Sequence, residues 1–229
     1  MKWLRGDREP DTIVRPSQYD GRADVAIQAT QLDGQYTAAE ARRIVREWEE
    51  FFGAGPSPIR RLRFTSRTPE RLFASLGGQT QLEMLSVKWG DYRDLTPLTE
   101  MSHLRTLHLK GASSVVDLSP LGRLVALADL TVEGIRGARD LSPLGGLAGV
   151  MTLELGGDWM SSRIAHVESF SFLRQMTRLR SLLLHTIAAD DHDYSALLNL
   201  PNLDSLRVME VQGMRPSIEV LRALPCWRA

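Results

Sequence analysis

The chain has 229 residues, with 28 basic and 28 acidic side chains, 43% apolar residues and a single cysteine. The balanced charge argues against a general binder of nucleic acids or membrane surfaces, because such proteins use a basic excess to attract phosphates. One cysteine, Cys226, excludes an internal disulfide framework and a cysteine-rich zinc module.

The sequence shows no recognisable targeting signal or membrane span. The N-terminus lacks the apolar core of a signal peptide, and no run of about 18 apolar residues occurs anywhere. We therefore expect a cytoplasmic protein that makes no membrane contact. Three lysines against 25 arginines are typical of a GC-rich coding sequence and favour a bacterial source.

Residues 1–58 form a predicted N-terminal segment, since only two of the 34 leucines precede residue 60. Val25, Ile27 and Ala29 alternate as in a strand. A capping box at Thr37 and Glu40 predicts a helix over about 37–52. One face of this helix is apolar and carries Ile44, Val45, Trp48, Phe51 and Phe52. We expect it to cover the first edge of the core that follows, with docking of a partner as the alternative.

Residues 59–229 are predicted to form an array of about seven repeats. The pattern apolar-x-x-apolar-x-apolar begins at positions 23, 22, 23, 23, 29 and 24 residues apart, namely at Ile59, Leu82, Leu104, Leu127, Val150, Leu179 and Leu203. In a strand, alternate side chains face opposite sides, so these apolar residues form one buried face. Because a single repeat cannot close its own core, the repeats must stack.

A second motif follows the central strands at a fixed offset: Asp94-Leu95-Thr96-Pro97-Leu98, Asp117-Leu118-Ser119-Pro120-Leu121 and Asp140-Leu141-Ser142-Pro143-Leu144. Ser or Thr before Pro suits the start of a short helical or 3₁₀ turn. With these motifs the chain resembles the leucine-rich repeat proteins, in particular the bacterial internalin-like type with short repeats. The resemblance implies an α/β solenoid with a curved parallel sheet on its concave face, short helical or 3₁₀ segments on its convex face, and here an N-terminal helical cap.

The turn after each strand departs from the family pattern. Leucine-rich repeats usually carry an asparagine there, and this chain has none at the seven equivalent positions. Its backbone groups need other partners, such as water or the carboxylates of Asp94, Asp117 and Asp140.

The fifth repeat is six residues longer than its neighbours, with the extra length between residues 156 and 166. We expect a loop there. Trp159 in this loop either packs locally or forms a binding prominence.

The side chains that alternate with the strand leucines are expected on the open concave face. The first three strands are basic and the next two acidic, which suits a folded partner of complementary charge. Apolar residues on or beside the strands add the anchors that dominate interface energetics. The predicted partner-binding residues are Arg61, Arg63, Lys88, Trp89, His108, Lys110, Asp129, Glu133, Glu154, Leu183, His185 and Arg207, with Trp159 from the loop.

Catalytic and cofactor motifs are not recognisable. No phosphate-binding glycine loop, Gly-x-Ser-x-Gly or His-Glu-x-x-His pattern occurs. Asp190-Asp191-His192-Asp193 has metal-ligand character but is best interpreted as a solvated turn. His108 and His185 lie too far apart along the sheet for a shared metal site, whereas either could form an acid–base pair with Asp129 or Glu154. We expect no catalytic residues, no metal and no cofactor.

The sequence therefore predicts a non-catalytic module that binds a protein or peptide on its concave face, as leucine-rich repeats most often do. An enzyme or accessory subunit with a pocket near the fifth repeat, bordered by Asp158, His166 and His185, is the alternative. Nucleic-acid binding is the weaker third hypothesis, and homo-oligomerisation stays open.

Overall fold

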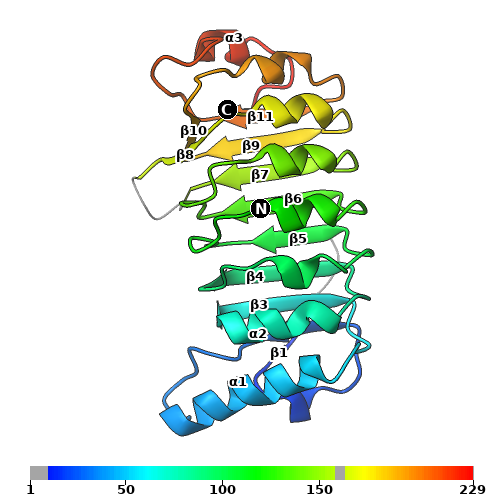
Figure 1. The fold of residues 1–229 in the computed structure, drawn as a ribbon. Helices are drawn as coiled ribbons and strands as arrows, with labels where there is room; N and C mark the ends of the chain where they lie inside the picture. The colour runs from blue at the N-terminus through cyan, green and yellow to red at the C-terminus, as the bar shows by residue number, and fades with distance from the viewer. Residues whose placement is uncertain (1–9, 158–162, 229) are drawn as a thin grey trace.

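The computed structural model describes residues 10–157 and 163–228, and in this part the chain forms one nine-stranded parallel sheet. Figure 1 shows the strands stacked in chain order, with the helical segments along one face. The strands are β1 (Thr12–Ile13), β2 (Asp24–Ile27), β3 (Arg61–Thr68), β4 (Met84–Gly90), β5 (Thr106–Leu109), β6 (Asp129–Glu133), β7 (Thr152–Gly156), β9 (Ser181–His185) and β11 (Ser205–Val208). All seven predicted repeat strands are present, so the predicted solenoid is confirmed.

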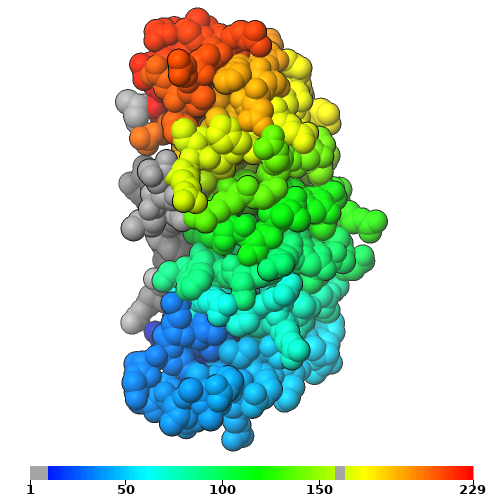
Figure 2. Space-filling model, turned by 60° about the vertical axis from the view of Figure 1, so that its left-hand side comes forward, coloured from blue at the N-terminus to red at the C-terminus, as the bar shows by residue number. Residues whose placement is uncertain are grey.

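The core is a single column between the sheet and the helical face. The strand leucines point into it, and Leu85, Leu107, Leu130 and Leu153 occupy equivalent positions on consecutive strands with almost no exposed surface. Figure 2 shows the elongated body that results, with the chain advancing steadily from one end to the other. Each repeat thus buries its apolar face against its neighbours, as the periodicity predicts.

The convex face is built from short helical pieces. Besides the helices α2 (Glu70–Ala74) and α3 (Ile218–Arg222), it has 3₁₀ segments at Ser75–Gly78, Thr96–Leu98, Ser119–Arg123, Ser142–Gly146, Ser171–Gln175 and Ser195–Asn199. The Ser/Thr-Pro motifs begin the three central ones, as predicted. The carboxylate of Asp117 accepts a hydrogen bond from the backbone N–H of Ser119 at 2.8 Å, and bonds from the Ser119 side chain and backbone lower the pKa of Asp117. Asp94 and Asp140 bond in the same way to Thr96 and Ser142.

The aspartates therefore cap their own 3₁₀ segments, and they do not replace the missing asparagines. At the turns after the strands, backbone groups of adjacent repeats bond to one another instead. Ala112 N–H donates to the Glu133 carbonyl at 2.8 Å, and Ile135 N–H donates to the Gly156 carbonyl at 3.1 Å. Gly111 and Gly134 precede these donors with φ of 62° and 78°, a left-handed conformation that glycine adopts without strain.

The fifth repeat contains more regular structure than an extruded loop. Part of its extra length forms β8 (Ala165–Val167), which pairs in parallel with β10 (Ile187–Ala189) of the next repeat. The predicted loop residues Asp158 and Trp159 lie outside the described residues. Despite the insertion, β7 and β9 pair in the same register as the other strands.

The N-terminal segment continues the sheet beyond the repeats. β2 pairs with β3, and β1 pairs with β2. The predicted helix is present as α1 (Ala38–Gly53), with its capping box formed between Thr37 and Glu40. It contacts α2 and the Ser75–Gly78 segment at the end of the convex layer (Figure 1). Within the described residues, no helix has the length and apolar character needed to cross a bilayer.

Tyr92 lies buried just after β4, and its hydroxyl has no hydrogen-bond partner among the described residues. Its ring stacks on Phe73 with 4.3 Å between the centroids. We expect Tyr92→Phe to raise the free energy of unfolding by about 1 kcal/mol, because it removes a hydroxyl that is buried without a bond.

The effect of Tyr92→Phe should grow in alkali. Burial raises the pKa of Tyr92 above its ordinary value. The unfolded protein therefore ionises this tyrosine first, and the native protein loses stability as the pH rises past about 10. Urea denaturation at neutral pH and at about pH 10.5 measures both effects. As control, Tyr19→Phe should lower the stability, since the Tyr19 hydroxyl donates to the Arg22 carbonyl at 3.0 Å. If Tyr92→Phe loses as much stability as the control, the Tyr92 hydroxyl must form a stabilising hydrogen bond, which would contradict this prediction.

Candidate functional site

The strand register places the predicted residues on the sheet face opposite the helical layer. Three rows run across the strands: one contains Arg61 and Asp129, a second Arg63, His108, Glu154, Leu183 and Arg207, and a third Lys88, Lys110, Glu133 and His185. The charge along this face is not a simple gradient, however, because most charged residues have a partner on the next strand.

At the basic end, both arginines bind an aspartate that was not among the predicted residues of this face. Asp24 of β2 accepts from Arg61 Nη2 at 2.8 Å and from Arg63 Nη1 at 2.5 Å. The alternation of Val25, Ile27 and Ala29 predicted a strand here, but the predicted open face began at the repeat that starts with Ile59 and did not include Asp24. Because β2 is the neighbour of β3, the two arginines and Asp24 together carry only one excess positive charge.

Further along the face, basic and acidic side chains again lie opposite one another on adjacent strands. His108 Nε2 of β5 lies 3.5 Å from Asp129 Oδ1 of β6, and Lys110 Nζ lies 2.9 Å from Glu133 Oε1. Lys88 and Arg207 differ from these residues, since both are exposed and neither forms an ion pair with the described residues. Leu183 is half-buried beside Arg207.

A groove of about 680 Å³ lies at the carboxyl ends of β3 to β6. Among the large apolar side chains that the described part of the chain exposes, Trp89 is the aromatic one, with 37% of its surface accessible. The pairing of β3 with β4 is irregular between Phe64 and Arg67, so Lys88 and Trp89 are both exposed although they are consecutive. The groove is lined by Arg67, Lys88, Trp89, Gly90, Asp91, Lys110, Gly111, Ser113, Ser114, Glu133, Gly134 and Arg136.

Arg67 lines this groove and contacts two of its other residues. Its guanidinium carbon lies 6.0 Å from the centroid of the Trp89 ring, and its Nη2 lies 2.6 Å from Asp91 Oδ2. Neither Arg67 nor Asp91 was predicted, because the alternation of the strand pattern ends before both. Four basic and two acidic side chains line the groove, which makes it electropositive.

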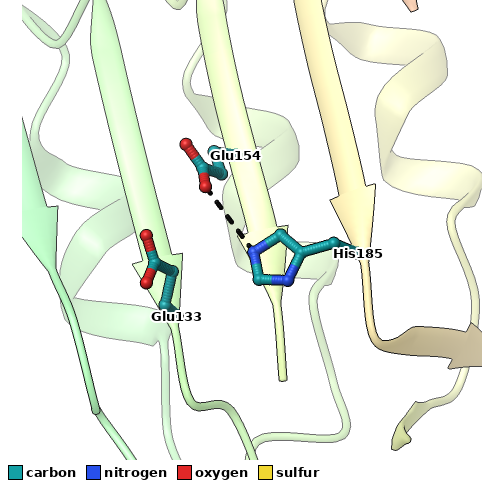
Figure 3. Close-up of side chains that lie close together, drawn as sticks. All are labelled: Glu133, Glu154 and His185. Atoms are coloured by element: carbon teal, nitrogen blue, oxygen red, sulfur yellow. Dashed lines mark ion pairs between the residues drawn. The ribbon is translucent and has the colours of Figure 1, made fainter. Parts of the chain in front are cut away.

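Glu133, Glu154 and His185 converge on one point of the same face, from three adjacent strands (Figure 3). Glu154 Oε1 lies 3.6 Å from His185 Nε2, and single ligand atoms of all three residues lie within 4.8 Å of one another. Glu133 and His185 are buried, with 8% and 6% of their surface accessible. The nearby imidazole of His185 lowers the pKa of Glu154 in spite of its burial.

Gly156 makes this convergence possible. It pairs with Glu133 on one side and with His185 on the other. A Cβ atom at Gly156 would lie 2.2 Å from Cε1 of the imidazole, so the ring occupies the place of the missing side chain. The sequence suggested that His108 or His185 could pair with Asp129 or Glu154, and both contacts are present, His108 with Asp129 and His185 with Glu154. The glycine between Glu133 and His185 is the signal that could have added Glu133 to this group.

The residues proposed for the alternative pocket near the fifth repeat have separate partners. His166 Nδ1 lies 3.0 Å from Asp190 Oδ1, and Asp190 also binds Arg139. His185 instead contacts Glu154. Asp193 accepts from the Ser195 N–H at 2.9 Å, which places the acidic cluster in a turn before a 3₁₀ segment.

A second, more open hollow of about 500 Å³ lies between α1 and the 3₁₀ segment Pro16–Gln18. Both arginines that line it are paired within the chain, because Glu47 binds Arg15 at 3.3 Å and Arg43 at 2.8 Å. The concave groove offers the more exposed aromatic ring, together with a lysine that forms no ion pair with the described residues.

No protein-family model and no curated protein matches the sequence. Solved structures do match the fold. An internalin of Listeria monocytogenes aligns with a TM-score of 0.62 and 17% identity over 89% of this chain and 52% of its own. The plant peptide hormone receptor RGFR1 in complex with RGF2 aligns with a TM-score of 0.51 and 14% identity, over 81% of this chain and 27% of the receptor chain. A second Listeria internalin aligns with a TM-score of 0.48 and 21% identity, over 66% and 59%.

The two alignments with a TM-score above 0.5 confirm the leucine-rich repeat fold, and the first of them its similarity to an internalin. At such identities they concern the fold alone. The alignment with the first internalin includes 89% of the residues of this chain. This chain spans only about half the length of that internalin.

Proposed function

We propose that this protein is an interaction module that binds an acidic peptide segment of a partner protein in the groove around Trp89. The observation that carries the proposal is the exposed Trp89 ring, with the Arg67 guanidinium beside it. The preceding residue, Lys88, is an exposed lysine that forms no ion pair with the described residues. Trp and Arg are the residue types enriched among interface hot spots. Burying the Trp89 ring under a partner would remove a large apolar surface from water.

The charge of the groove favours an acidic partner. Lys110 is neutralised by Glu133 and Arg67 by Asp91, whereas exposed Lys88 has no such partner among the described residues. An aspartate or glutamate of the partner beside Lys88 would gain an ion pair at an interface that excludes water. The volume of about 680 Å³ suits a few side chains of a peptide. A structural neighbour with the same fold was solved with a peptide hormone, which supports peptide binding as a use of this fold.

Selection from a random peptide library tests the proposal. We expect wild-type protein to enrich peptides that combine Asp or Glu with an apolar side chain. Trp89→Ala should weaken the selected peptides about 30-fold, because loss of a hot spot costs about 2 kcal/mol. Lys88→Glu should weaken them by a similar factor through like-charge repulsion. Fluorescence anisotropy with a labelled peptide measures these affinities.

Arg207→Glu is the matched control, since Arg207 is also an exposed cation of the same face without an ion pair among the described residues, but it lies on β11. Its affinity for the selected peptides should equal that of the wild type. Peptides that bind Trp89→Ala as tightly as the wild type, or that lose affinity only in Arg207→Glu, would place the binding site elsewhere.

A further inference from the structure

We propose that Glu133, Glu154 and His185 form a site for a divalent transition-metal ion of the Zn²⁺ type, bound through one atom of each residue. Their ligand atoms lie within 4.8 Å of one another. The 3.6 Å between Glu154 Oε1 and His185 Nε2 is long for a hydrogen bond. It is close to the edge of about 3.3 Å in a tetrahedron with metal bonds of about 2.0–2.1 Å. Small side-chain rotations would therefore complete the coordination.

The backbone holds the three ligands in place. They come from β6, β7 and β9, which are consecutive neighbours in the sheet. Glu133 and His185 reach the space above Gly156 from its two sides, while Glu154 rises from the same strand two residues earlier. Ligands on paired strands need little ordering when the ion binds, because the sheet has already fixed their separation.

The second nitrogen of the imidazole is also positioned. His185 Nδ1 lies 3.1 Å from the Thr186 hydroxyl oxygen. With the Nδ1 proton donated to that oxygen, the lone pair of Nε2 points at Glu154. Metal-binding histidines are commonly oriented by such a bond from their other nitrogen. Imidazole with carboxylates is a donor set that suits Zn²⁺ and its neighbours, whereas Ca²⁺ and Mg²⁺ prefer oxygen alone.

Charge and access are consistent with a cation. The site offers two carboxylates, and Lys110 Nζ contacts one of them, that of Glu133, at 2.9 Å. The carboxylates therefore outnumber this ammonium by one, which favours binding of a cation. Glu133 also lines the groove, which gives the cluster an opening to solvent. Three protein ligands leave the fourth tetrahedral position for water or for a group of a bound molecule.

Titration of untagged, chelator-treated full-length protein with ZnCl₂ by isothermal calorimetry tests the proposal. We expect one ion per chain. His185→Gln and Glu154→Gln should each lower the affinity at least about tenfold. Gly156→Ala should do the same without removing a ligand, because its Cβ displaces the imidazole. Thermal unfolding of each variant without metal identifies any that fails to fold, and the remaining variants then decide.

His108→Gln and His166→Gln are the controls. Among the described residues, each of these histidines pairs with one carboxylate, that of Asp129 or Asp190 respectively, so both variants should bind Zn²⁺ like the wild type. Absence of binding by the wild type would overturn the proposal. So would wild-type affinity in folded His185→Gln, or a loss confined to the controls. Because the test uses the metal alone, its outcome is independent of peptide binding at Trp89.

Discussion

Replacing Trp48 by alanine is expected to lower the free energy of unfolding by about 4 kcal/mol. The indole is completely buried under α1, where it stacks on Phe52 with 5.5 Å between centroids and meets Phe51 edge-on at 5.4 Å. Its Nε1 donates to the Val14 carbonyl at 2.8 Å, so one side chain joins α1 to the segment after β1. The substitution leaves a cavity and an unsatisfied carbonyl at the end of the core.

Stability in a repeat array is transmitted between neighbours, so this loss should reach β3 and the first repeats. Urea denaturation followed by far-UV circular dichroism measures it. Trp48→Phe should cost less, since it removes the N–H and part of the ring. Arg46→Ala is the control on the exposed side of the same helix, with an expected change below about 0.5 kcal/mol. A loss below about 1 kcal/mol in Trp48→Ala would show that α1 does not stabilise the array.

Lys110→Glu is expected to lower the free energy of unfolding by about 3 kcal/mol, whereas Lys88→Glu should leave it almost unchanged. Lys110 Nζ contacts Glu133 Oε1 at 2.9 Å, and the Glu133 side chain is only 11% exposed. Reversal of the charge leaves Glu133 buried without its cation and brings a third carboxylate towards Glu133 and Glu154. Lys88 is exposed and forms no ion pair with the described residues, so its replacement by glutamate places the new carboxylate in solvent.

Chemical denaturation of both variants in parallel checks this contrast, with each serving as the control for the other. Equal losses would mean that the Lys110–Glu133 pair contributes nothing to the native state. The result also decides which variant is usable in binding studies. We expect Lys88→Glu to report on the partner site, whereas Lys110→Glu would confuse lost binding with lost stability.

The leucine register predicted the fold because burial of apolar residues depends mainly on their spacing. Leu85, Leu107 and Leu130 recur at the interval that a strand and a turn require, and each is buried where the alternation places it. The Ser-Pro turns and the capping box of α1 also follow from local sequence, since their hydrogen bonds join residues two or three positions apart. The six extra residues of the fifth repeat did not disturb the pairing of β7 with β9.

The candidate sites were predicted less well, because they depend on residues that are far apart in the chain. The sequence identified Arg61, Arg63 and Lys110 as cations of one face but not Asp24 and Glu133 as their partners. It named Trp89 without the irregular strand pairing that exposes this ring beside Lys88. It suggested a pair of a histidine with Glu154 or Asp129 and named Glu133 separately, without the space above Gly156 in which Glu133, Glu154 and His185 meet.

The sequence by itself thus determined the repeat, the buried face of each strand and the set of side chains that line the open face. These features follow from periodicity and from bonds between near neighbours in the chain. Only the tertiary structure decided which of those side chains are neutralised, which remain exposed and which converge. Those outcomes depend on distances of a few ångströms between adjacent strands, such as the 2.9 Å between Lys110 and Glu133. Electrostatic energies change steeply over such distances, and residue spacing along the chain does not specify them.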